Sequence, residues 1–122
     1  MTLGRLFGGL SIVLALSGCG GNDGPPLSAE GSVGRQVAAD SGCMACHGDD
    51  GSGGVGPAWI GLADSMVELN DGTTVVADDA YLARSITHPD ESQVATYTLR
   101  MPSNSLGDAD VAAVVAYIRD LK

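Results

Sequence analysis

The feature that most constrains this chain is a run of five residues, Cys43-Met44-Ala45-Cys46-His47. The two thiols are three positions apart, so one tight turn brings them to the same side of the chain. The imidazole follows directly after the second thiol. Thiolate and imidazole groups are common ligands of soft and borderline metals, and thiols also form covalent bonds. Any fold of this chain must therefore accommodate a reactive site at this turn.

Three kinds of site use this spacing: a thioredoxin-like redox pair, half of a zinc site, and a covalently attached haem. A redox pair is expected in a β-α-β setting, which the surrounding sequence does not predict, and a zinc site needs a second pair of ligands. C-x-x-C-H is the attachment signature of c-type haem. Each thiol can add to one vinyl group of the porphyrin, and the next imidazole then lies under the iron. The run predicts one haem c held by Cys43 and Cys46, with His47 on the iron.

Composition supports a cofactor inside the core. The chain has 122 residues, enough for one domain, but only one Trp, three Tyr and one Phe. The single Phe lies in an N-terminal segment that is expected to be removed. A domain of this size buries little apolar surface by itself, so we expect an aliphatic core completed by the haem.

An electron-carrying haem needs a second axial ligand, and Met101 is the expected one. A thioether is a soft ligand that favours ferrous iron and raises the reduction potential. Met101 precedes a proline in a polar loop ahead of the last predicted helix. The other methionines are poorer candidates, because Met1 is removed, Met44 is inside the attachment turn and Met66 is in a predicted hairpin.

Two alternatives remain for the sixth position of the iron. His88 is the other histidine of the chain, and as a ligand it would give a bis-histidine haem of lower potential, although its place before Pro89 is typical of a surface residue that ends a helix. An open sixth position would instead indicate a haem peroxidase or a gas-binding protein.

The N-terminus has the layout of a secretory signal. Residues 1–5 carry one positive charge, and an apolar run follows over residues 6–17. The run ends in Leu16-Ser17-Gly18-Cys19, which resembles the bacterial lipoprotein box, where cleavage before the cysteine precedes lipidation of its thiol. The alternative is an uncleaved anchor helix, but a bilayer span needs roughly 20 apolar residues. Residues 1–18 are therefore expected to be a signal peptide, and Cys19 the lipidated residue.

The expected domain organisation follows from these boundaries. Residues 19–30 are rich in Gly, Pro and Asn and are expected to form a flexible tether. Residues 31–122 are expected to form the haem domain. The mature protein is expected to be exported and lipid-anchored to a bacterial membrane, with the haem domain on the periplasmic or extracellular side.

Periodicity predicts three helices in the domain, over residues 33–40, 77–86 and 108–121. The last has valine, isoleucine and leucine at the spacing of one apolar face. Residues 66–69 and 73–76 flank an Asn-Asp-Gly turn, which predicts a small β-hairpin. We expect this hairpin to be an insertion outside the core.

Together these residues resemble class I monohaem cytochromes c over the whole domain. They look most similar to the cytochrome c domain fused to subunit II of some bacterial haem-copper oxidases. The matching segments are residues 43–48, 53–57, 71–75, 79–86, 101–102 and 115–118. The copper-binding domain and membrane hairpin of that subunit have no counterpart in this sequence, so a free-standing carrier of similar shape is expected.

The resemblance implies an all-α fold, with short helices wrapped round one haem. It implies that the Pro57 carbonyl accepts a hydrogen bond from the ring N–H of His47, as partners of metal-bound histidines do. Gly34 and Tyr117 would lie at the crossing of the first and last helices. Trp59 stands where the family often has a smaller aliphatic residue, and it is expected to pack on the haem edge.

The implied function is electron transfer by a respiratory carrier that is not an enzyme. Formal net charge is -9, which disfavours binding to nucleic acid or to anionic lipid. It favours redox partners with a basic docking patch, such as a terminal oxidase or a quinol-oxidising complex. Arg84 and Arg100 are candidates for a hydrogen bond to a haem propionate, and the alternative for each is a solvated arginine. The alternative is a fixed haem subunit of a larger oxidase or dehydrogenase.

Overall fold

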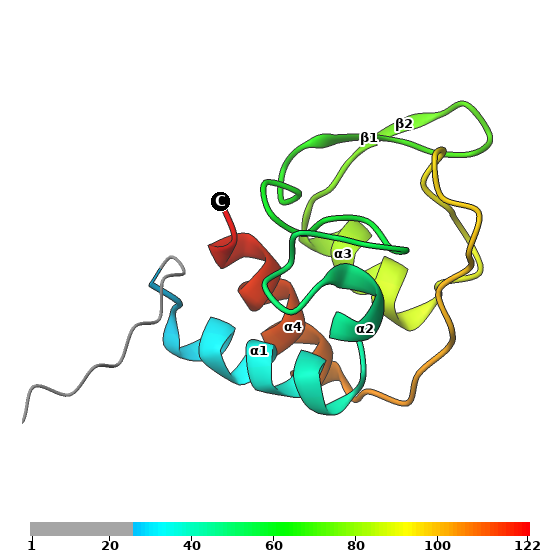
Figure 1. Ribbon diagram of the computed structural model, residues 1–122. Helices are drawn as coiled ribbons and strands as arrows, with labels where there is room; N and C mark the ends of the chain where they lie inside the picture. Colours follow the sequence, from blue (N-terminus) through cyan, green and yellow to red (C-terminus); the bar gives the residue numbers. More distant parts are fainter. Residues whose placement is uncertain (1–25) are drawn as a thin grey trace, which may run out of the picture.

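A computed structural model describes residues 26–122, which form four helices and a two-stranded sheet (Figure 1). The expected signal peptide, Cys19 and the first part of the expected tether lie outside the described residues. No helix within residues 26–122 is long and apolar enough to cross a membrane. The elements are α1 Ala29–Asp40, α2 Met44–His47, β1 Met66–Glu68, β2 Thr74–Val76, α3 Asp79–Thr87 and α4 Asp108–Asp120.

The frame of the domain is the crossing of α1 and α4, as the resemblance implies. A Cβ atom at Gly34 would collide with the backbone carbonyl of Ala113, so only glycine lets the two helices approach this closely. Tyr117 is 1% exposed and Val114 is also buried, both on the inner face of α4. α4 spans almost the whole of its predicted range, because its apolar periodicity is strong.

Helix α1 begins at Ala29, four residues earlier than the start predicted at residue 33. Ser28 caps it, since its Oγ accepts a hydrogen bond from Gly31 N at 2.9 Å. The backbone N–H and the hydroxyl of Ser28 both donate to Asp120 Oδ2 at 2.7 Å. The end of the predicted tether, residues 28–30, is therefore part of the folded domain, because a carboxylate at the end of α4 holds it.

The predicted hairpin is present, with β1 and β2 antiparallel and Met66 opposite Val76. The expectation that it lies outside the core was wrong. Val67 is 7% exposed and Leu69 8% exposed, and both belong to the main apolar cluster. Leu69 forms a bridge with Val94, which joins the hairpin to the long loop that follows α3.

Helix α3 begins at Asp79, two residues after the predicted start, because Asp78 is its cap and accepts a hydrogen bond from Tyr81 N at 2.8 Å. Leu82 and Ile86 are buried, as their spacing predicted. Arg119 of α4 pairs with Asp79 at 2.7 Å and with Asp64 at 2.9 Å. These pairs connect the end of α4 to α3 and to the loop ahead of the hairpin.

Candidate functional site

The C-x-x-C-H run forms the short helix α2 and the residue before it. His47 N donates to Cys43 O at 3.1 Å, so the two ends of the run lie one turn apart. Both cysteines are half-buried free thiols. Burial is the main cause that raises the pKa of the Cys43 thiol, which is therefore protonated at neutral pH. The turn holds two thiols and one imidazole at a single point on the surface of the core.

The ring of His47 is buried and hydrogen-bonded. Its Nδ1 lies 2.7 Å from the carbonyl oxygen of Pro57, the contact that the family resemblance implies. Because a carbonyl can only accept, Nδ1 carries the proton and donates, and Nε2 is left with a lone pair. Burial lowers the pKa of His47, so the ring is neutral at pH 7. Neutral imidazole with a free Nε2 is the form that binds a metal.

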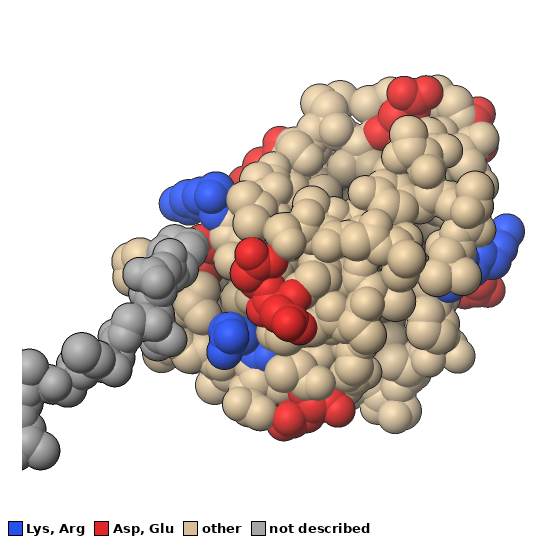
Figure 2. All heavy atoms as spheres, in the orientation of Figure 1, with Lys and Arg blue, Asp and Glu red and all other residues tan. Residues whose placement is uncertain are grey.

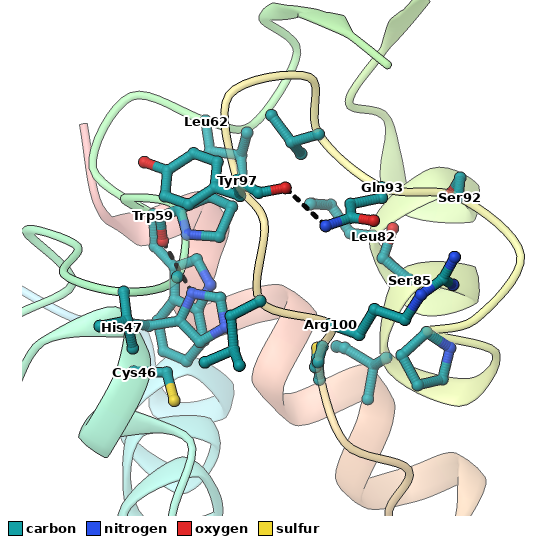
Figure 3. A pocket seen from close by; sticks show the side chains of 18 of the residues that line it. Cys46, His47, Trp59, Leu62, Leu82, Ser85, Ser92, Gln93, Tyr97 and Arg100 are labelled. Carbon is teal, nitrogen blue, oxygen red and sulfur yellow. Dashed lines mark hydrogen bonds between the residues drawn. The ribbon is translucent and has the colours of Figure 1, made fainter. Parts of the chain in front are cut away.

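Trp59 lies against this imidazole (Figure 3). The two ring centroids are 4.5 Å apart and the planes meet at 19°, which is a stacked arrangement. On its other side, the indole meets Tyr117 edge to face, with centroids 5.9 Å apart and planes at 87°. The His47 ring is thereby connected through Trp59 to the α1–α4 frame.

A large pocket opens beside His47 and has two walls. One wall is the attachment turn with the segment that follows it, and the other is α3 with the loop that leads to α4. Its empty volume is about 1010 Å³, open solvent included. The lining is Cys46, His47, Val55, Gly56, Pro57, Trp59, Leu62, Tyr81, Leu82, Ser85, Ile86, Pro89, Ser92, Gln93, Val94, Tyr97, Leu99, Arg100, Met101, Pro102 and Ile118.

Five of the six residues expected to bind the cofactor line this pocket: Cys46, His47, Pro57, Trp59 and Met101. Cys43 does not line it but packs against the apolar core at the start of α2. A wide apolar space with an imidazole on one wall and a thioether on the other suits a flat, apolar, iron-containing ring. The donor set and the lining therefore fit a haem.

Three residues whose roles the sequence left open differ in position. His88 is exposed and outside the lining, and its Nδ1 lies 2.8 Å from Thr87 Oγ1. Arg84 is also outside the lining and pairs with Glu91 at 2.5 Å. Arg100 lines the pocket, and Figure 3 shows its side chain on the wall opposite His47.

Several lining residues could not be identified from the sequence. Tyr97 and Gln93 belong to no motif, yet Gln93 Nε2 donates to the Tyr97 carbonyl at 2.5 Å and shapes the loop over the pocket. Leu62 follows Trp59 in a stretch without regular structure. The one sequence signal for Tyr97 was the scarcity of aromatic residues. A tyrosine in a polar loop needs an apolar group to pack against, and this chain offers few.

Comparison with known proteins agrees with this site. The family model described as cytochrome c matches residues 32–122. Cytochrome c2 iso-1 of Magnetospirillum molischianum is 35% identical over 100 residues, which cover 66% of this chain and 90% of that protein. The chain therefore belongs to the cytochrome c family, whose members carry a covalently bound c-type haem, and Cys43 and Cys46 have the spacing of its attachment motif.

Proposed function

We propose that this chain is a membrane-tethered electron carrier with His47 and Met101 as the axial ligands of its haem. When bound, the haem supplies a one-electron cycle between ferric and ferrous iron. The observation that carries the proposal is the pocket, which has a neutral, oriented imidazole on one wall and the Met101 thioether among the residues of the other. Membership of the cytochrome c family supports electron transfer as the activity.

The protein residues have separate tasks in this proposal. Cys43 and Cys46 would form the two thioether bonds, and His47 would present Nε2 to the iron while Pro57 holds its Nδ1–H. Met101 would supply its thioether from the other wall and so exclude exogenous ligands. With both side chains as ligands, the surrounding chain would not need to rearrange when the oxidation state changes.

Arg100, not Arg84, is the proposed partner of a haem propionate. Arg100 lines the pocket, whereas Arg84 is already paired with Glu91 outside it. Arg100 Nη1 makes a single long contact with Asp90 O at 3.4 Å, which leaves its other N–H groups for a carboxylate.

The partners are proposed to be redox proteins, with a terminal oxidase or a quinol-oxidising complex as the candidates. The net charge of -9 would attract a basic surface from a distance. The contact area round the pocket is different, since residues 51–63 and 92–107 contain no Asp or Glu. Figure 2 shows such a division, with uncharged atoms across the centre and right of the face and charged groups left of centre and at the margins. Charge is proposed to steer approach, and uncharged atoms to make the contact.

The tether is part of the proposal. Residues 1–18 would be a signal peptide, Cys19 would carry the lipid, and the flexible stretch would end before Ser28, where α1 is capped. The protein would then be exported, with its haem domain outside the cytoplasmic membrane. Labelling with radioactive palmitate should mark the wild-type protein, and Cys19→Ala should abolish the label and release haem protein to the soluble fraction. Unchanged labelling in Cys19→Ala would contradict the lipid anchor.

A redox titration of the matured protein tests the function itself. We expect a reversible one-electron transition and a ferrous form that does not bind carbon monoxide at neutral pH. Ready carbon monoxide binding would favour a haem peroxidase or gas-binding protein. Stoichiometric co-purification with a membrane complex would favour a fixed subunit of an oxidase or dehydrogenase, such as the resemblance to oxidase subunit II suggests. A bimolecular rate that stays constant with ionic strength for every candidate partner would contradict charge steering.

A further inference from the structure

The imidazole of His47 is restrained in a way that the attachment motif does not require. Its Nδ1 contacts Pro57 O at 2.7 Å, which fixes the direction of one edge of the ring. A single hydrogen bond still allows the ring plane to tilt about the bond that joins it to the chain. Trp59 opposes that tilt, because its indole lies nearly parallel to the imidazole at 4.5 Å.

Backbone also passes close to the Cε1–Nδ1 edge of the imidazole. A Cβ atom added at Gly56 would lie 3.1 Å from His47 Cε1 and 3.3 Å from Nδ1, so the chain passes close to the ring there. His47 is 8% exposed and Trp59 is 6% exposed. The imidazole is thus enclosed by the indole, by the Gly56 backbone and by the Pro57 carbonyl.

Trp59 is itself held from two directions. Its backbone N–H donates to Gly51 O at 2.8 Å. Its indole meets the ring of Tyr117, which is 1% exposed at the α1–α4 crossing, with planes at 87°. A smaller aliphatic side chain at position 59 could contact neither ring in these geometries, because it has no flat face to stack and no edge to offer.

We propose that Trp59 is a positioning residue that sets the rotation of the His47 ring plane, and hence the orientation of the axial ligand over the haem. The proposal rests on His47 ligation in the proposed function. The plane of an axial imidazole decides which iron d orbital it overlaps, so it controls the magnetic anisotropy of low-spin ferric iron. Partners of metal-bound histidines act on the metal in this way, through ring orientation.

Electron paramagnetic resonance of the ferric holoprotein tests the proposal, because it reports ligand orientation and observes only molecules that have acquired haem. Trp59→Leu should replace the single low-spin signal with a broadened or second signal of different largest g value. Trp59→Phe keeps a stacked ring and should retain the wild-type g values. Ile60→Ala truncates the apolar side chain next to Trp59 in the sequence, which is 46% exposed and outside the pocket lining, and should leave the g values unchanged.

The outcomes separate this role from simple packing. If Trp59→Leu keeps the wild-type g values, or if Leu and Phe change them equally, the positioning role is wrong. If Ile60→Ala shifts them as far as Trp59→Leu does, the effect is general loosening of this segment and the proposal fails. The sulfur-to-iron absorption band of the same samples monitors Met101 ligation separately. Loss of that band in the wild type would count against the proposed function, not against the role of Trp59.

Discussion

The two walls of the pocket are built differently. On the His47 wall, the ring is enclosed by Trp59, Gly56 and Pro57, and a helix carries its backbone. On the Met101 wall, most residues from 98 to 105 are exposed, and the main side-chain contact is Asn104 Nδ2 donating to Ile86 O at 2.7 Å. The protein alone organises the first wall. In the proposed function, the second would depend far more on a bond from Met101 to the iron.

This difference suggests that the two walls of the pocket have different roles. In the proposed function, the His47 wall would keep the attachment geometry constant through each change of oxidation state. The Met101 wall would complete the site with a surface that has no acidic side chain over residues 92–107, where Leu99 is 60% exposed. Under stress, the Met101 bond should therefore be lost before the His47 bond.

The largest expected effect comes from removing the covalent attachment. Cys43→Ser combined with Cys46→Ser should give an unfolded apoprotein, because the haem supplies the apolar body between the two walls. Far-ultraviolet circular dichroism during heating measures this. A cooperative thermal transition without haem would show that the two walls fold without it, and would contradict the claim that the Met101 wall depends on the haem.

A smaller effect is expected from opening the Met101 wall alone. Met101→Ala should keep the covalent haem and the helical content, but lose the sulfur-to-iron band and bind carbon monoxide in the ferrous form. The midpoint potential should fall, because a soft thioether stabilises ferrous iron. Met66→Ala is the matched control, since Met66 is 67% exposed on the hairpin and outside the pocket lining. Equal spectra for Met101→Ala and wild type would show that Met101 is not a ligand of the iron.

The smallest effect tests the shortest side-chain hydrogen bond of the Met101 loop. Asn104→Ala removes the bond that Asn104 Nδ2 donates to Ile86 O and the bond that Asn104 Oδ1 accepts from Leu106 N, each worth about 0.5–1.5 kcal/mol. In a denaturant titration, the sulfur band should be lost at a lower concentration than in wild type, while loss of helicity shifts less. Ser105→Ala, in the same exposed loop, should change neither midpoint. Simultaneous loss of band and helicity in every variant would mean that the two walls unfold as one unit.

Local sequence patterns were sufficient to predict much of this structure. The attachment turn, the helix faces of α3 and α4, and the presence of the hairpin depend on neighbouring residues, and these predictions were correct apart from helix ends. The cytochrome c fold and its covalent haem also follow from short motifs. Where the family pattern was needed, as for the Pro57 carbonyl, the expected contact is present at 2.7 Å.

What could not be predicted depends on contacts between distant residues. The early start of α1 requires Ser28 to reach Asp120, 92 positions away. Burial of the hairpin depends on the bridge between Leu69 and Val94. The restraint on His47 depends on a tryptophan held by Tyr117 of α4. No local periodicity encodes any of these pairings, so they become visible only when the chain is folded.

The most direct test of the central claim is the absorption spectrum of protein matured with the haem-attachment machinery. The reduced-minus-oxidised difference should show a sharp c-type α-band, and the oxidised form should show the weak near-infrared band of sulfur bonded to ferric iron. Both bands together are predicted by His47 and Met101 ligation. A c-type spectrum without the sulfur band would contradict Met101 as ligand, and absence of covalent haem would contradict the account as a whole.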